Sequence, residues 1–282
     1  SDNSAICNDD YLQSQINSHQ NKHKNKATYS SFNNSVDLLV NDKKDKAKEY
    51  SKKIAKYAWD KRFEMDSTVP SIEEGLKEAV EIKEKPVVLM DTGDNIGGGS
   101  SADSTHILHK ARELGINGIL QSLYDPESVK KCIGNIGSEI TLEVGGKSDD
   151  LHGAPLQVTG RIKKYSDGIF EDLGRTHGGH KHFDGGDTIL LETNENNTLI
   201  LTSKRVGNTS IQLYLHLGID PKEYPIIIAK GVMSPRPAFE PIASKIITLD
   251  SPGVTASGLN NFNFKNRRKP MFPFEKEEVS YN

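Results

Sequence analysis

Hydrophobic and polar positions change their spacing several times along this chain of 282 residues, and each change predicts a different kind of structure. Residues 1–35 are polar and rich in Asn, Lys, Ser and Gln, with few apolar positions. Such a segment buries too little apolar surface to offset the entropy lost on ordering, so we predict a disordered polar tail. Order is predicted to begin with a short strand over residues 36–40 and a helix from Asp42 to about Arg62.

Helical and strand patterns alternate between residues 70 and 134. Ser71 followed by Glu74 is a capping-box sequence and predicts a helix to about Val80. Residues 86–91 form a nearly continuous apolar run, which predicts a buried strand. The other elements expected here are a helix that ends at Gly115, a strand over 116–124, and a helix that starts at Asp125 and turns Val129 and Ile133 inward. This alternation favours parallel strands joined by right-handed crossovers.

The middle of the chain has a different pattern, in which short strands follow one another with turns between them. Strands are predicted over 139–144, 156–164, 188–193 and 199–203, with a hairpin turn over 194–197. Helix and strand then alternate again, with helices over 211–217 and 239–243, strands over 226–230 and 246–249, and an extended, proline-containing end at 266–274 whose aromatic residues pack on the rest of the chain. The predicted fold class is therefore α/β: an open, mainly parallel sheet with helices, interrupted by a mostly antiparallel β insertion.

Charge and cysteine content narrow the function classes. The formal net charge is only −3, which argues against broad electrostatic binding to nucleic acid or to an anionic membrane. No apolar run reaches the roughly 18 residues that a membrane span needs. The two cysteines, Cys7 and Cys132, form no disulfide framework and no paired metal motif, as expected in a reducing compartment. We therefore expect a cytoplasmic protein without nucleic-acid or membrane partners.

A glycine-rich segment is the strongest candidate for a binding site. Asp94, Asn95 and the three consecutive glycines Gly97, Gly98 and Gly99 come directly after the buried strand at 86–91 and before a helix. Ligands of open α/β sheets bind where strands end and helices begin. Exposed backbone N–H groups there favour an anion or a carbonyl oxygen. The alternative is a tight turn that is capped by Asp103 or Ser104 and binds no ligand.

A histidine-rich segment is a second candidate. His177, His180, His182 and Asp184 lie within eight residues and offer the nitrogen and oxygen ligands that zinc or nickel prefers. Glycines on both sides favour a solvated loop between two strands instead.

Basic residues near strand ends form a third group, with Lys147, Lys204, Arg205, Lys230 and Arg236 as its members. Arg236 follows the predicted strand at 226–230, so it is expected at the same edge as the glycine segment, where it could hold a carboxylate bidentately. The alternative for each of these residues is an ordinary surface salt bridge.

Motifs in a fixed order give the sequence a family resemblance. Asp94, Asn95 and the three glycines, with Asp103 following, resemble the C-terminal domain of the microcystinase-C-like (MlrC) zinc metallopeptidases. Further matching motifs occupy residues 142–147, 160–161, 166–168, 201–206, 217–221, 236–242, 250–253 and 267–273. The resemblance covers about residues 67–282, and residues 36–66 resemble the last strand and helix of the family's upstream domain.

The resemblance implies part of a hydrolase rather than a whole one. The family's zinc is held by the N-terminal domain, so zinc is expected in the full-length enzyme and none in this chain, for which no catalytic or metal-binding residues are assigned. The implied role is a domain that completes the substrate cleft and is inactive alone. Its partners would be the zinc-bearing domain, in the same or another chain, and a small peptide-like or amide substrate. The substrate-binding residues are predicted to be Asp94, Asn95, Gly97, Gly98, Gly99, Asp103, Arg205 and Arg236. The alternatives are a small-anion binding module without catalysis and an autonomous metalloenzyme that uses the histidine segment.

Overall fold

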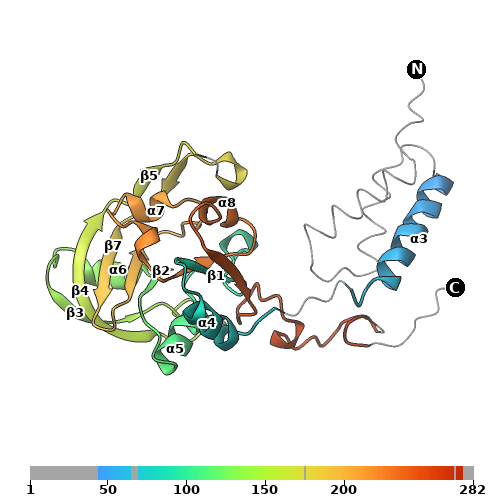
Figure 1. Cartoon of the computed structure of the whole chain (residues 1–282), viewed down its shortest axis with the longest axis horizontal. Coiled ribbons are helices and arrows are strands. Elements are labelled where there is room, and N and C mark those ends of the chain that lie inside the picture. The colour runs from blue at the N-terminus through green and yellow to red at the C-terminus, as the bar shows by residue number, and fades with distance from the viewer. Residues whose placement is uncertain (1–43, 65–68, 175, 270, 276–282) are drawn as a thin grey trace, which may run out of the picture. The chain divides into compact units, whose positions relative to one another are not determined.

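The computed structural model describes residues 44–64, 69–174, 176–269 and 271–275 (Figure 1). They belong to two compact units. One unit is residues 69–262, and the other combines the described residues before 65 with those after 262. The predicted tail and the predicted strand over 36–40 lie outside the described residues, as does the segment 65–68 next to the predicted domain boundary.

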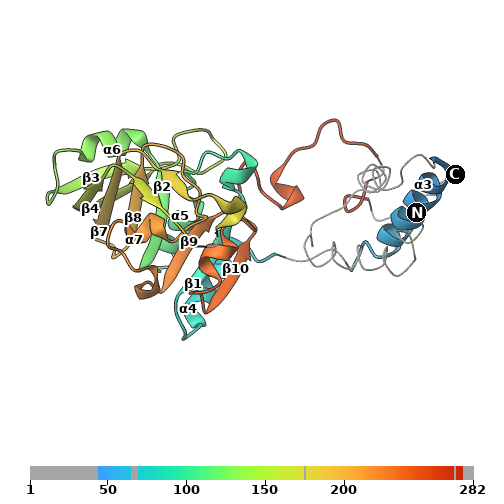
Figure 2. The ribbon, with the colours of Figure 1, turned by 90° about the horizontal axis from the view of Figure 1, so that it is seen from above.

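Residues 69–262 are built on an eight-stranded sheet, whose strands lie side by side in Figure 2. Their order is β10 (Lys245–Leu249), β1 (Val87–Asp91), β9 (Ile226–Lys230), β2 (Ile119–Tyr124), β8 (Thr198–Thr202), β7 (Thr188–Thr193), β4 (Leu156–Ser166) and β3 (Glu139–Val144). The first five run parallel, and from β8 to β3 every neighbouring pair is antiparallel. This confirms the predicted α/β class, with its mainly parallel sheet and antiparallel part.

The pairing of the parallel strands differs from the order along the chain. β1 and β2 follow each other in sequence, but β9 lies between them and pairs with both. All five residues of β9 are buried, as expected for the centre of a sheet that is covered on both faces. Local pattern cannot specify this insertion, because β9 lies about a hundred residues after β2 in the chain.

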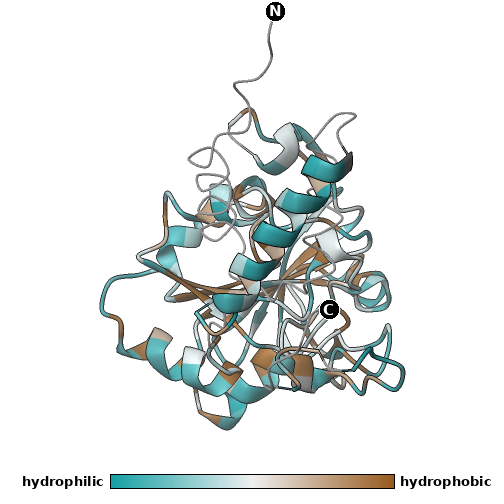
Figure 3. Ribbon diagram, turned by 90° about the vertical axis from the view of Figure 1, so that its right-hand side faces the viewer, coloured by the Kyte–Doolittle hydropathy of each residue, from teal (hydrophilic) through white to brown (hydrophobic). Residues whose placement is uncertain are grey.

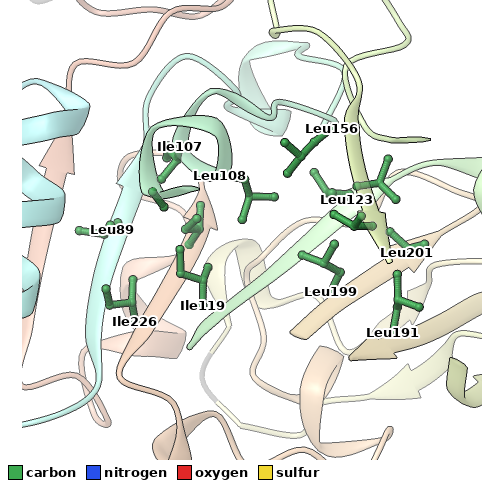
Figure 4. Packing of buried hydrophobic residues seen from close by; sticks show 14 of the residues in the cluster. Leu89, Ile107, Leu108, Ile119, Leu123, Leu156, Leu191, Leu199, Leu201 and Ile226 are labelled. Atoms are coloured by element: carbon green, nitrogen blue, oxygen red, sulfur yellow. The ribbon is translucent and has the colours of Figure 1, made fainter. Parts of the chain in front are cut away.

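Two hydrophobic layers cover the sheet. On one face, α4 (Ile72–Glu81), α5 (His106–Glu113) and α6 (Pro126–Cys132) contribute apolar side chains to a core with strand residues such as Leu89 and Leu199 (Figure 4). On the other face, α7 (Gln212–Leu215) and α8 (Arg236–Phe239) pack against residues such as Val88 and Ile227. Most strand ribbons in Figure 3 are brown, consistent with their buried apolar composition.

Several boundaries differ from the predicted ones. Ile133 was expected to point inward but is 44% exposed, because α6 ends at Cys132 and the chain turns away. The helix predicted over 239–243 is misplaced, because α8 runs from Arg236 to Phe239 and shares only Phe239 with the predicted range. A second sheet of two three-residue strands, β5 (Ile169–Glu171) and β6 (His182–Asp184), was not predicted. By contrast, the capping box of Ser71 and Glu74 is present at the start of α4.

The other unit contains helix α3 (Lys44–Asp60), which confirms the helix predicted there. Within this unit the rings of Trp59 and Phe63 meet the ring of Phe272 edge-on, with centroids 6.4 and 5.2 Å apart. The guanidinium of Arg62 lies 4.3 Å from the centroid of the Trp59 ring. The terminal aromatic segment thus contacts the end of the α3 region. No described helix of the chain has the length and apolar content to cross a membrane.

Candidate functional site

The candidate site lies where the parallel strands end. β10, β1, β9, β2 and β8 all run in the same direction, so their carboxyl ends meet at one edge of the sheet. The glycine segment follows β1, and Arg205 and Arg236 follow β8 and β9. This edge is where open α/β sheets bind ligands, and it is called the carboxyl edge below.

Residues 95–99 form an exposed turn, called the glycine turn. Ile96–Gly98 is one turn of 3-10 helix, and Gly99 ends it with φ +93°, a conformation that favours glycine. The N–H groups of Gly98 and Gly99 donate to the carbonyls of Asn95 and Ile96 at 2.9 and 3.0 Å. Two of the three glycine donors expected for a ligand are therefore used inside the turn. The N–H of Gly97 and the side-chain amide of Asn95 make no hydrogen bond within the described part of the chain.

Asp94 lies beneath this turn, fully buried, and accepts four hydrogen bonds. One carboxylate oxygen accepts from the hydroxyl of Ser100 at 2.5 Å and from the N–H of Ala102 at 2.7 Å. The other accepts from the N–H of Ser104 at 2.8 Å and from Nζ of Lys230 at 2.6 Å. Asp94 therefore fixes the segment after the glycine turn, and its direct contact with a substrate stays a prediction.

The charge of Asp94 is stabilised inside the protein. Burial by itself raises the pKa of this carboxyl, but the ammonium of Lys230 and the hydrogen bonds from Ser100 and Ser104 outweigh burial and hold the pKa at about 2. The side chains of Asp94 and Lys230 are 0% and 1% exposed. A buried pair of this kind is costly to break, since removing one partner leaves an uncompensated charge.

Asp91, the last residue of β1, is a second buried carboxylate in this network. Its Oδ1 accepts from the hydroxyl of Ser251 at 2.5 Å and from the N–H of Asp94 at 3.3 Å. Its Oδ2 is buried and has no hydrogen-bond partner among the described residues. Burial raises the pKa of Asp91, and Lys230 opposes that rise only in part. When Asp91 is protonated and neutral, the ammonium of Lys230 forms its ion pair with the carboxylate of Asp94 alone.

His152 connects three loops at the carboxyl edge. Its Nδ1 lies 2.8 Å from Oδ1 of Asp149, and its Nε2 lies 2.9 Å from the hydroxyl of Ser100. The N–H of Val254 points to the same Nε2 at 3.4 Å. A Ser-His-Asp series is also the order of a hydrolytic triad, but Ser100 is buried and its hydroxyl contacts Asp94. The arrangement therefore positions loops and presents no accessible nucleophile.

Asp103 is also buried, but it binds a neighbouring loop. Its Oδ2 accepts from the N–H groups of Lys147 and Ser148, both at 2.9 Å, and its Oδ1 accepts from the hydroxyl of Ser101. Helix α5 begins after Thr105, without a side-chain cap. The capping role considered for Asp103 or Ser104 is therefore wrong, and Asp103 joins the glycine segment to the loop after β3.

The two arginines predicted at this edge differ in their partners. Nε of Arg205 donates to the carbonyl of Ser101 at 3.1 Å, and its guanidinium lies 4.8 Å from the centroid of the Tyr124 ring. Nη1 of Arg236 instead lies 3.4 Å from Oε1 of Glu240, the residue directly after the end of α8.

The histidine segment lies on the hairpin of β5 and β6. His177, His180 and His182 are exposed, and Nδ1 of His182 lies 3.0 Å from Glu171 on the paired strand. No three His, Cys, Asp or Glu side chains come together as a metal site in the described ranges. The residues that the structure describes therefore do not fit the zinc that the family resemblance suggests for the whole enzyme.

The sequence analysis named Lys230 as a basic residue near a strand end but did not pair it with Asp94, and it missed His152 altogether. Lys230 ends a strand whose other residues are all apolar, and this unusual ending was a usable signal. His152 follows an aspartate-rich turn and had no comparable signal in the sequence.

Comparisons with known proteins agree with this fold. A family model described as the MlrC C-terminus matches residues 89–266. Microcystinase C of Sphingomonas sp. is 26% identical over 195 residues, which are 67% of this chain and 36% of that protein. A crystal structure of a Mesorhizobium sp. BNC1 protein, provisionally classed as a metallopeptidase, superposes with a TM-score of 0.68 at 24% identity, over 82% of this chain and 46% of that one. At that identity the superposition shows the shared fold. The chain spans less than half the length of either relative.

Proposed function

This chain belongs to the family of MlrC C-terminal domains, and from that premise we propose that it forms one wall of the substrate cleft of a zinc-dependent amide or peptide hydrolase. The zinc would be held by an N-terminal domain, in the same or another chain, so this chain is proposed to be inactive alone. The buried Cys132, which forms no disulfide in the described residues, supports a reducing, cytoplasmic location.

The observation that carries the proposal is a buried charge network placed under an exposed turn. Asp94 and Lys230 are removed from water and bond to each other, and the other hydrogen bonds of the Asp94 carboxylate come from backbone and hydroxyl groups of residues 100–104 rather than from a core helix. Buried ion pairs seldom add stability compared with apolar residues of similar size. The presence of a buried ion pair at the carboxyl edge is best explained by a need for a fixed loop geometry at that edge.

Asn95 and Gly97 are the residues proposed to meet the substrate. The amide of Asn95 is partly exposed, and the N–H of Gly97 is exposed and has no partner in the described residues. Both groups can bind a peptide oxygen, and the fixed turn would orient them without further loss of entropy. Gly98 and Gly99 would keep the turn in shape. The buried side chains of Asp94 and Asp103 would hold the glycine segment in position through their hydrogen bonds.

A small-anion binding module is less well supported. Such a module needs several backbone N–H groups that point to one ligand, whereas Gly98 and Gly99 use theirs inside the turn. The exposed histidines do not favour an autonomous metalloenzyme, because the described residues gather no metal site.

Reconstitution tests the proposal. The purified chain with added zinc is expected to hydrolyse none of a panel of peptide amides. Adding the part of microcystinase C that this chain does not match, also loaded with zinc, is expected to give hydrolysis of a substrate of that enzyme. Gly98→Val is expected to lower this activity at least tenfold, because a Cβ there would lie 2.6 Å from the methyl group of Thr255. Turnover by the chain alone would contradict the proposal, and so would unchanged kinetics of the Gly98→Val assembly.

A further inference from the structure

We propose that Arg205 is a preorganised receptor for a carboxylate group, and that the substrate bound at the carboxyl edge carries a free carboxylate. This inference rests on the proposed function, because it assigns a substrate class to the same cleft. Sequence reasoning gave the carboxylate to Arg236, and the contacts of the two arginines favour Arg205 instead.

Arg205 lies at the same edge as the glycine turn. It comes three residues after the end of β8, and Thr202 of β8 is in register with Tyr124 of the parallel strand β2. Its Nε reaches the carbonyl of Ser101, only two residues after the glycine turn. The arginine is therefore tied directly to the segment that the buried network fixes.

Two contacts hold the guanidinium of Arg205 in place. The bond from Nε to Ser101 at 3.1 Å sets one edge of the plane, and the ring of Tyr124, 4.8 Å from the guanidinium carbon, supports its face. Arg205 is nevertheless exposed, and Nη1 and Nη2 have no hydrogen-bond partner in the described part of the chain. These two nitrogens form the fork that binds a carboxylate bidentately, already oriented before a ligand arrives.

The carbonyl of Ser101 is itself held by an unusual backbone conformation. Ala102, the next residue, has φ +69°, which is rare for a residue with a Cβ. Its N–H donates to Asp94 at 2.7 Å, and its carbonyl accepts from the N–H of Tyr124 at 2.9 Å. Backbone strain of this kind persists where the surroundings enforce it, and it is concentrated at functional sites. The buried network therefore fixes the Ser101 carbonyl and the backbone that carries the Tyr124 ring, which are the two supports of Arg205.

Charge pairing separates Arg205 from the other basic residues near this edge. Lys230 pairs with Asp94, Lys147 with Asp125 at 2.9 Å, Lys204 with Asp184 at 2.5 Å, and Arg236 with Glu240 at 3.4 Å. Arg205 has no acidic partner within the described ranges. A single unpaired, planar cation matches a carboxylate, which carries one negative charge on two coplanar oxygens.

Side-chain NMR of the whole chain tests this assignment. The Nε–Hε signal of Arg205 is identified by its loss in Arg205→Lys. The ¹⁵N-labelled chain is then titrated with N-acetyl-alanyl-alanine and with its C-terminal amide at matched ionic strength. We expect a saturable shift with the acid and an apparent affinity at least fivefold weaker for the amide. Arg205→Gln also lacks the Nε–Hε signal, so the backbone N–H signals of Gly97 and Ser101 follow binding in both variants. By these signals Arg205→Gln is expected to abolish the difference between acid and amide, whereas the matched variant Arg236→Gln is expected to keep it. Backbone spectra of both variants confirm that the fold is retained.

Three results would overturn the inference: equal binding of acid and amide, loss of discrimination in Arg236→Gln but not in Arg205→Gln, or no saturable shift at millimolar peptide in the folded chain. The proposed function fails separately, in the reconstitution assay. Carboxylate discrimination at Arg205 without reconstituted hydrolysis would retain the site and reject the hydrolase. Reconstituted hydrolysis without carboxylate discrimination would retain the hydrolase and reject the carboxylate site at Arg205.

Discussion

The glycine segment and the histidine segment both contain residues suited to a functional site, but their surroundings in the structure are opposite. Over residues 94–105, the side chains of Asp94, Ser100 and Asp103 are buried, and each is hydrogen-bonded to the protein. Over residues 177–184, the histidines are exposed, and they lie on a hairpin whose strands have three residues each. One segment is fixed by the fold, whereas the other is exposed at the surface.

This difference teaches that residue type alone does not identify a site. Three histidines and an aspartate have the right chemistry for a metal, but the β5–β6 hairpin does not bring them together. Asp94 and Lys230 are 136 positions apart in sequence and form the central contact of the candidate site. The feature that separates the two segments is burial together with hydrogen bonds to residues far away in the sequence, which only the fold supplies.

The largest expected effect comes from breaking the buried ion pair. Lys230→Met leaves the carboxylate of Asp94 buried without its cation, and we expect a loss of about 3–5 kcal/mol in the free energy of unfolding. The matched control is Lys204→Met, since Lys204 pairs with Asp184 of the histidine segment at 60% and 50% side-chain exposure. Its loss is expected to stay below about 1 kcal/mol. Urea denaturation measures both, and similar losses for the two variants would contradict the comparison.

A pair of histidine variants is expected to show the next largest difference. His152→Ala removes a fully buried side chain that bonds to Asp149 and Ser100, so we expect a loss of about 2–3 kcal/mol. His182→Ala removes a side chain that is 78% exposed and is expected to change stability by no more than about 0.5 kcal/mol. Thermal unfolding at pH 7 measures both. A loss for His182→Ala as large as that for His152→Ala would show that the hairpin is more than a surface feature.

A smaller effect is expected in the pH dependence of stability. Burial raises the pKa of Asp91 above its unfolded value of 3.8. Its folded form therefore binds the proton more tightly, so its contribution to stability is complete below pH 3.8 and is lost as the pH rises toward the folded pKa. In the Asp91→Asn variant the side chain cannot ionise, so this loss of stability with rising pH is absent. The stability of this variant relative to wild type is thus expected to improve between pH 4 and pH 7 in denaturant titrations. A constant difference over that range would rule out a raised pKa.

How much the sequence could predict depends on the range of the interactions. The capping box at Ser71 and Glu74 and the buried strand β1 follow from a few neighbouring residues, and both are confirmed. The strands β5 and β6 have only three residues each and are stabilised by the stacked rings of Phe170 and Phe183, 5.0 Å apart. Segments this short carry no alternating pattern, so they were missed.

For the candidate site too, the features that depend on neighbouring residues could be predicted, and those that depend on distant residues could not. The carboxyl edge and the glycine turn could be predicted, because a glycine-rich segment directly follows an apolar strand. The insertion of β9 beside β1 could not, and that insertion brings Lys230 opposite Asp91 and within reach of Asp94. Contacts between distant segments depend on strand order, which local periodicity does not encode.

The most direct test of the central claim is the kcat/KM of the reconstituted hydrolase with Asn95→Ala in this chain. Asn95 lies on the glycine turn and its amide is proposed to meet the substrate, so we expect a loss of at least tenfold with zinc content and stability unchanged. Asn194→Ala, at the exposed tip of the β7–β8 hairpin, serves as the matched control and is expected to keep full activity. Equal activity of the two variants would contradict the claim that the glycine turn forms a wall of the cleft.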